Sequence, residues 1–403
     1  MEKQYIKTAI AVCLVMSAMI AGTVSLGFFM EPVTTSLGFN RAAFSLYFSL
    51  ITIVGTITLP AYGRLIEKFG TRPFVIFGGL WTGITMAAFS LCHDLPAFYV
   101  VGCLVGLGFF GCSYAAAPVI VSAWFAKKNG LVMGLAAACG GTIGMLLSLI
   151  FPSFIIGYGW EAGYVFLGIV VFALTTPVGI FLLRSRPSEV GLRPYGADCV
   201  DEQAAMSDLP GISYRQALWM PQMWATTIAF VLLMATIMIT QHLVAYFVSI
   251  GFDAVMAGVF MSIMSAGIIV TNILAGVITD KIGLMESLLI CSILYCVSFL
   301  LLPASGSFAV ICIALVFMSL GNANASVFAP VVTQAIFGMR DYASIWGLVS
   351  MACVLGQAIG APLWGLAYDL TGSYAVAMYI SAIIVCIAFV ILAWARRSAP
   401  KSS

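Results

Sequence analysis

Long runs of apolar residues, separated by short polar turns, cover almost the whole chain. Most runs reach about 20 residues, the length at which an α-helix crosses about 30 Å of hydrocarbon. Apolar and polar positions do not alternate within them, as they do in the strands of a membrane barrel. We therefore predict twelve membrane-spanning helices, with boundaries good to a few residues. They cover residues 8–30, 41–63, 73–92, 97–123, 129–156, 161–184, 222–249, 255–279, 284–303, 307–336, 341–367 and 372–395.

Composition excludes a water-soluble protein. Of the 403 residues, 62% are hydrophobic and only 8% are charged, whereas a soluble domain carries about 25% charged residues. In lipid, every backbone N–H and C=O must be paired within the protein, and helices achieve this. The expected fold class is an all-α membrane protein. Glu31-Pro32 after the first apolar run is no small-residue cleavage site, so this run is read as the first helix and not as a signal peptide.

The positive charges predict the orientation of these helices. When both chain ends are placed in the cytoplasm, 16 of the 17 Lys and Arg residues fall in cytoplasmic segments, and only Arg41 falls outside. Cytoplasmic loops of membrane proteins carry such an excess of Lys and Arg. We expect a multi-pass protein of the cell inner membrane, with its N- and C-termini in the cytoplasm.

One long polar segment, residues 185–215, divides the chain into two nearly equal parts. We predict a six-helix bundle over residues 1–184, a cytoplasmic linker over 185–215, and a second six-helix bundle over 216–403. The linker is interpreted as a solvated tether, and a regulatory role is the alternative.

A short motif occurs at equivalent places in the two halves. Residues 63–70 and 276–283 both fit Gly-x-x-x-acid-Lys-x-Gly, in a turn between the second and third helix of each half. Two copies at equivalent places indicate a duplication, and parallel six-helix repeats are an established transporter architecture. Glycines permit a tight turn, and we expect charged side chains there to hold one conformational state closed. The alternative is that these charges only set topology. The predicted latch residues are Gly63, Glu67, Gly70, Arg72, Gly276, Asp280 and Gly283.

These two turns resemble the loop signature of the major facilitator superfamily, with Glu67 where an Asp is usual. Other stretches resemble its monocarboxylate and oxalate:formate branch. They are residues 124–130, Gly134, Gly140, Gly141, Gly144, residues 158–160, Gly347, Gly356, Gly360, Pro362, Gly365, Tyr368 and Asp369. The resemblance implies the major facilitator fold, a central cavity between two bundles, alternating access, and a small organic solute as cargo.

The chain lacks the positively charged side chains that are usual inside the helices of that branch. Members of the branch resemble one another in having an arginine late in the eighth helix, and in this chain Asn272 aligns with that arginine. Helices 1 and 11 also have no interior lysine, and Glu161 stands where a basic residue is common. A monocarboxylate or related organic anion remains the leading cargo, and a neutral or zwitterionic metabolite such as an amino acid is the alternative.

Polar side chains inside the predicted spans are the candidate solute contacts. His242 is the titratable side chain well inside a span, and its ordinary pKa suits a proton relay. A neutral, hydrogen-bonded histidine is the equally weighted alternative. Amides and phenols in lipid need polar partners, found either between helices or in a cavity. The predicted substrate-binding residues are Tyr47, Tyr114, His242, Asn272, Asn322 and Gln357, with His242 as the proton-coupling candidate.

Other classes of function receive little support from the residues. The 11 cysteines show no metal-like spacing, no phosphate-binding loop motif occurs, and no span holds paired acids or a catalytic triad. We expect no cofactor, no metal, no enzyme activity and no nucleic-acid partner. The prediction is a monomeric secondary carrier that works by proton symport or solute exchange on a small-molecule substrate. A non-transporting membrane sensor is the alternative from a different class.

Overall fold

The computed structural model describes residues 3–109, 116–125, 129–185, 187–193, 195, 211–338 and 340–398. In these ranges the chain is helical, with two isolated β-bridges and no strand. It divides into two compact units. Unit 1 holds residues 1–200 and 251–262, and unit 2 holds residues 201–250 and 263–403.

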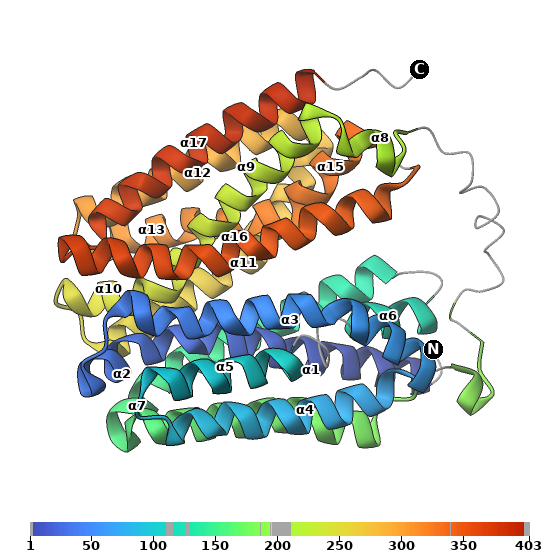
Figure 1. Ribbon diagram of the computed structural model, residues 1–403, viewed down its shortest axis with the longest axis horizontal. Coiled ribbons are helices and arrows are strands. Elements are labelled where there is room, and N and C mark those ends of the chain that lie inside the picture. Colours follow the sequence, from blue (N-terminus) through green and yellow to red (C-terminus); the bar gives the residue numbers. More distant parts are fainter. Residues whose placement is uncertain are drawn as a thin grey trace. The chain divides into compact units, whose positions relative to one another are not determined.

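Unit 1 is built from helices that run alongside one another (Figure 1). In chain order they are α1 (Lys3–Leu26), η1 (Gly27–Phe29), α2 (Met30–Leu37), α3 (Arg41–Phe69), α4 (Thr71–Ala88), η2 (Phe89–Leu91), α5 (Leu95–Phe109), α6 (Ala116–Trp124) and α7 (Asn129–Phe181). Inside α7, Gly159 has φ +85° and ψ +165°, which breaks the helical path. Since left-handed φ is easy for glycine alone, this break agrees with the two spans predicted over 129–156 and 161–184.

Unit 2 repeats this plan. Its helices are α8 (Tyr214–Leu218), α9 (Pro221–Ile237), η7 (Met238–His242), α10 (Leu243–Ser249), α11 (Ala254–Ile282), α12 (Leu284–Ala304), α13 (Phe308–Met318), α14 (Leu320–Ala323), the π-turn η8 (Asn324–Phe328), α15 (Ala329–Phe337), α16 (Tyr342–Thr371) and α17 (Ala375–Arg397). The first residues of α11, up to Ser262, belong to unit 1. There the Ser262 hydroxyl donates to Met145 O of α7 at 3.1 Å.

Nine of the helices in the described ranges are long and apolar enough to span a membrane, and two shorter apolar helices, Leu95–Phe109 and Phe308–Ala323, accompany them. The protein is thus a multi-pass membrane protein. The count of twelve spans and the cytoplasmic position of both termini stay predictions.

The duplicated turn motif has the same backbone geometry in both copies. Gly70 has φ +81° and ψ +167°, and Gly283 has φ +101° and ψ +161°. Each glycine amide donates to the carbonyl four residues earlier, Ile66 O at 2.8 Å and Thr279 O at 3.1 Å, and each glycine then precedes the next helix. Both positions require the left-handed region, where a side chain is strained.

The repeat extends well beyond this motif. A constant spacing of 213 residues (from 70 to 283) also relates the turn glycines Gly38 and Gly251, and it superimposes the bounds of α3 on those of α11. The same spacing places the end of η1, at Phe29, on the end of η7, at His242. Each half therefore interrupts its first long helix with a 3₁₀ turn at the same position.

Glycines set the close approach of helices in unit 1. A Cβ on Gly140 of α7 would lie 2.3 Å from Cδ1 of Ile20 in α1, and a Cβ on Gly106 of α5 would lie 2.6 Å from Ile51 O in α3. Small residues permit such contacts between membrane helices. Gly134, in contrast, has nothing within 4 Å of such an atom.

Both described ends of the polar linker are docked on the unit next to them, and a solvated tether between them stays a prediction. In unit 1, Tyr195 N donates to Trp124 O at 2.9 Å, and the Tyr5 hydroxyl donates to Arg193 O at 2.6 Å. In unit 2, Ile212 N donates to Phe337 O at 2.8 Å. Trp124 ends α6 and Phe337 ends α15, so each end of the linker pairs with the end of a helix of its own unit.

The positively charged residue that the charge analysis places outside has a partner in the structure. Arg41 Nη2 donates to the Glu31 carboxylate, which also accepts from the Thr35 hydroxyl at 3.3 Å. The pair joins the first turn of α2 to the start of α3, and both side chains are partly buried. An ion pair compensates the charge that a lone arginine would leave at this end of the bundle.

Candidate functional site

His242 is buried at the end of the 3₁₀ turn η7, and both of its ring nitrogens are hydrogen-bonded within unit 2. Nε2 lies 2.9 Å from Ala361 O of α16, and Nδ1 lies 3.1 Å from the hydroxyl of Tyr374, at the start of α17. A carbonyl oxygen only accepts, so Nε2 carries the proton, and in the neutral ring Nδ1 accepts from Tyr374. The imidazole thus ties η7 to two other helices.

The duplication gives this contact a counterpart in unit 1. Phe29, which the repeat aligns with His242, stacks on Tyr164 with ring centroids 3.7 Å apart and planes 10° apart. Tyr164 and Tyr374 are the last residues of two Tyr-x-x-x-x-x-Tyr stretches, 158–164 and 368–374, which are 210 residues apart and therefore three residues out of the 213-residue register. The 3₁₀ turn in the first long helix is therefore held by an aromatic stack in unit 1 and by a histidine–tyrosine hydrogen bond in unit 2.

The seam between α9 and α16 continues from His242 through small residues. Gly356 and Gly360 lie one turn apart on α16 and face the backbone of Val231 and Ala235. The Trp364 indole then donates to Ala235 O at 2.7 Å. Such close helix contacts are typical of small-x-x-x-small stretches, so this face of α16 packs tightly on α9.

Gln357 lies on the same seam as His242. Its Nε2 is 3.8 Å from Sδ of Met234 in α9, a weak contact for an amide. The side chain is half-buried, as expected of a residue at the edge of a helix contact. Two of the six predicted substrate-binding residues therefore lie along one helix contact of unit 2, at different heights.

Asn272 and Asn322 flank a second polar contact, between α11 and α13. The hydroxyls of Thr271 and Ser319 lie 3.1 Å apart, and Asn322 N donates to Ser319 O at 3.1 Å. Both asparagines are half-buried. They form a second candidate pair within unit 2.

Tyr47 lies apart from both pairs, in unit 1. It is 2% exposed, and its ring packs against Phe44, Phe89 and Phe98 at centroid distances of 4.8, 5.3 and 6.1 Å. These contacts supply a packing role for the phenol, and a solute contact stays a prediction. Tyr114 lies outside the described residues.

Asn324 lies in the same predicted span as Asn322 and is not among the predicted substrate-binding residues. It is fully buried at the first position of the π-turn η8, and neither its Oδ1 nor its Nδ2 has a hydrogen-bond partner in the part of the chain that the structure describes. Leaving such a group unsatisfied costs about 1–3 kcal/mol. Single π-turns occur often at functional sites. No pattern in the sequence signals a π-turn here.

The predicted latch residues are distributed over the two repeated turns. Gly63 and Glu67 lie in the last turns of α3, and Gly276 and Asp280 lie in the corresponding turns of α11. The structure describes the backbone of these turns, as given above for Gly70 and Gly283, but not the side chains of Glu67 and Asp280. A latch role for these residues stays a prediction.

Arg72, the remaining predicted latch residue, is hydrogen-bonded within its own unit. Its Nε donates to Gly179 O at 3.1 Å, and its Nη2 donates to Ile180 O at 2.9 Å, both at the C-terminal end of α7. Its backbone N–H donates to the Ser185 hydroxyl at 3.1 Å. A cation is stabilised at the negative, C-terminal end of a helix dipole. The guanidinium therefore caps the C-terminus of α7 and holds the first turn of α4 against it.

Replacing Arg72 by glutamine is therefore expected to destabilise unit 1. Hydrogen bonds of charged groups contribute about 1.5–3 kcal/mol, and the loss should lower the midpoint of thermal unfolding in detergent by a few degrees. Lys7→Gln removes the same charge from an exposed side chain and is the matched control. Equal midpoints for the two variants would show that the contact with α7 does not stabilise the unit.

The cysteines carry no chemistry that the structure reveals. All cysteines in the described ranges are free, and no group of three or more metal-binding side chains occurs in those ranges. Cys92 is buried in the turn before α5.

Comparison with known sequences identifies relatives over most of the chain. The profile of the Major Facilitator Superfamily matches residues 10–287 and 249–403. The oxalate:formate antiporter of Oxalobacter formigenes is 25% identical over 365 residues, covering 85% of this chain and 82% of that protein. Monocarboxylate transporter 13 of Rattus norvegicus is 24% identical over 364 residues, covering 89% of this chain and 81% of that protein.

Solved structures share the fold at low sequence identity. The nucleoside transporter NupG superimposes with a TM-score of 0.78 and 13% identity, covering 97% of this chain and 99% of that one. A bacterial homologue of the human lysosomal transporter Spinster gives a TM-score of 0.76 and 12% identity, covering 99% and 98%. The fold and the sequence match agree, and the chain belongs to the major facilitator superfamily, whose members are membrane transporters and not enzymes.

Proposed function

We propose that this protein exchanges small organic anions, monocarboxylates or related carboxylates, across the cell inner membrane. The observation that carries the proposal is the similarity, over more than four fifths of the chain, to an oxalate:formate antiporter and to a monocarboxylate transporter. Twelve helices in two six-helix bundles, residues 1–184 and 216–403, cytoplasmic termini, a monomeric state and alternating access belong to the same proposal.

The geometry of His242 favours exchange over proton symport. It is the titratable side chain that the sequence places well inside a span, and a carbonyl and a tyrosine engage its two ring nitrogens. A relay through this ring has to break or reverse one of these bonds. Proton symport is the second candidate, since Nδ1 can become a donor if the Tyr374 hydroxyl turns to accept.

The resemblance to the branch implies a positively charged side chain that contacts the carboxylate of the solute. In this chain, amide side chains are the candidates for that contact. Asn272 and Asn322 present neutral donors close to one interhelical contact in unit 2, and Gln357 presents a third on α16. Hydrogen bonds from neutral donors to a carboxylate are charge-assisted. We propose these amides as contacts of the solute, with a neutral or zwitterionic metabolite as the alternative cargo.

Counterflow in proteoliposomes tests the proposal. Vesicles containing the full chain are loaded with unlabelled formate, oxalate or a neutral amino acid, and uptake of each labelled solute is followed with and without an inward proton gradient. We expect uptake of a carboxylate to rise about tenfold with internal carboxylate and to ignore the gradient. Gradient-driven uptake into empty vesicles would support symport, uptake of the amino acid alone would support the alternative cargo, and no uptake of any solute would support a sensor.

Asn324→Leu is expected to separate stability from transport. Removing the unsatisfied amide should stabilise the protein by about 1 kcal/mol, while a polar group held ready for the solute would be lost and exchange would slow severalfold. Functional sites often show this trade-off. Thermal unfolding in detergent and counterflow measure the two effects. A lower unfolding midpoint would instead mean that ordered water satisfies the amide and that it has a structural role.

A further inference from the structure

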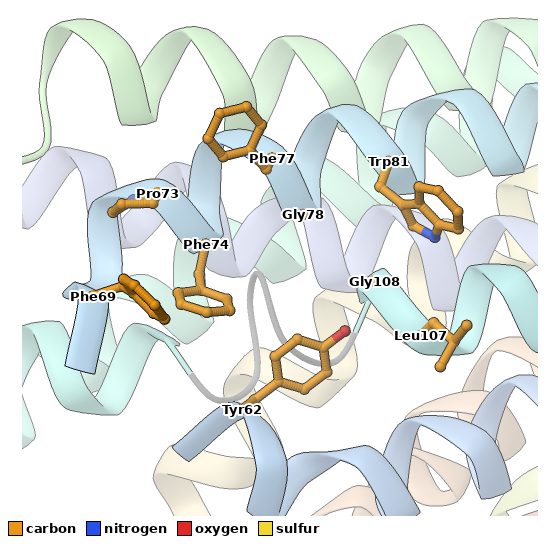
Figure 2. A pocket seen from close by; sticks show the side chains of 9 residues that line it. All are labelled: Tyr62, Phe69, Pro73, Phe74, Phe77, Gly78, Trp81, Leu107 and Gly108. Atoms are coloured by element: carbon orange, nitrogen blue, oxygen red, sulfur yellow. The ribbon is translucent and has the colours of Figure 1, made fainter. Parts of the chain in front are cut away.

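A groove opens on the surface of unit 1 between α3 and α4, and α5 lies at the end of the groove next to Trp81 (Figure 2). Its volume is about 490 Å³. The lining residues are Tyr62, Phe69, Pro73, Phe74, Phe77, Gly78, Trp81, Leu107 and Gly108. Phe77 is 68% exposed and Phe69 is 56% exposed. Large apolar side chains exposed on a membrane-spanning helix contact hydrocarbon, so the groove opens toward lipid.

The walls of the groove are held in place. The Trp81 indole donates to Leu104 O of α5 at 2.8 Å, which fixes the ring across two helices. A Cβ on Gly108 would lie 2.5 Å from Cδ1 of Trp81, so the glycine leaves the space that the indole occupies. The far end of the groove is therefore a fixed aromatic surface that does not depend on a ligand.

A cation lies at the other end of the groove. Lys68 is exposed at the end of α3, and its Nζ lies 5.1 Å from the centroid of the Phe69 ring, which lines the groove. The aromatic face attracts the ammonium group. The groove is thus apolar along its length and positively charged where α3 turns into α4.

The dimensions and the charge specify one occupant. From Pro73 to Trp81 the wall of α4 rises about 12 Å, close to the ~15 Å depth of one leaflet of a bilayer core. An acyl chain gains no hydrophobic free energy on leaving other acyl chains, so selection must come from the headgroup. We propose that this groove binds an acyl chain of an anionic phospholipid, with the headgroup phosphate at Lys68.

Quenching of Trp81 by lipids with brominated acyl chains tests the proposal on the full chain in bilayers. Brominated phosphatidylglycerol and brominated phosphatidylcholine with the same chains are compared, and the signal of Trp81 is the difference between the wild type and Trp81→Phe. One basic residue near a membrane surface contributes about a fivefold preference for an anionic lipid. We expect that preference in the wild type, and its loss in Lys68→Gln.

Lys281→Gln is the matched control, because the repeat spacing aligns Lys281 at the end of α11 with Lys68, and it should keep the fivefold preference. Leu107→Phe, which narrows the groove at its α5 end without adding an indole, should weaken quenching by both lipids. Equal quenching of Trp81 by the two lipids in the wild type would overturn the proposal, as would an unchanged preference in Lys68→Gln.

Discussion

Adding one methyl group to Gly360 is expected to disrupt unit 2 more than most substitutions in this protein. A Cβ there would lie 2.5 Å from Ala235 O and 2.8 Å from Ala235 Cα, which are backbone atoms that cannot turn aside. At Gly356 the distances are 2.3 Å to Val231 O and 2.9 Å to Val231 Cα. Overpacking costs about 1–3 kcal/mol per site and sometimes more, so Gly356→Ala with Gly360→Ala should remove most of the folded protein.

The measurement is the midpoint of thermal unfolding and the yield of monodisperse protein in detergent. Gly347→Ala is the control on the same helix, because nothing lies within 4 Å of its added Cβ. That variant should be neutral or slightly more stable, since alanine is favoured over glycine inside helices by about 1 kcal/mol. If the double variant unfolds at the wild-type temperature, α9 and α16 do not depend on this close approach.

Several features of the fold could be predicted from residues that act locally. The hydrophobic runs predicted the long apolar helices, and the two Gly-x-x-x-acid-Lys-x-Gly stretches predicted turns that the structure confirms in the backbone of Gly70 and Gly283. A turn of this kind depends only on the torsion angles of one glycine. A second pair of similar stretches, on which no prediction above depends, also indicates the repeat. Ser-Leu-Gly-Phe-Asn (36–40) and Ser-Ile-Gly-Phe-Asp (249–253) carry the same 213-residue spacing.

The partners of polar side chains could not be predicted in the same way, because they come from helices distant in the sequence. Arg72 binds carbonyls of α7 more than 100 residues away, at the end of a helix in its own unit. Tyr47 packs against Phe44 of its own helix and against aromatic rings of two other segments, η2 and α5. The spacing of residues on one helix fixes which face a side chain shares, but not which helix covers that face.

His242 shows how the repeat can decide between two interpretations of one residue. As a single residue in a span, it fits a proton relay and a hydrogen-bonded packing residue equally well. The repeat aligns His242 with Phe29, and the contacts of His242 with Tyr374 and of Phe29 with Tyr164 show that both halves place a ring contact at this point. Because unit 1 has phenylalanine at this position, the fold requires an aromatic ring there and not a titratable group. A titratable group is required in unit 2 only if that unit has acquired a new role.

Exchanging His242 for alanine and for phenylalanine is expected to give opposite results. His242→Ala leaves a cavity in a site that is 1% exposed and removes the bond to Tyr374, and a large-to-small substitution of this kind costs about 3–5 kcal/mol. His242→Phe copies Phe29, keeps the ring volume, and loses two hydrogen bonds at about 1 kcal/mol each. We expect His242→Phe to fold with a modestly lower unfolding midpoint and to exchange solute at a rate close to that of the wild type.

The pH dependence of transport by His242→Phe distinguishes the two roles, because a merely structural ring does not alter it. Solute exchange without a proton relay predicts the same pH profile for the wild type, for His242→Phe and for Tyr374→Phe, which removes only the hydroxyl partner. If His242→Phe folds but no longer responds to a proton gradient that drives the wild type, then the imidazole carries the coupling proton. The hydrogen bond to Tyr374 would then be its path, and unit 2 would differ from unit 1 by the proton-binding group that replaced an aromatic stack.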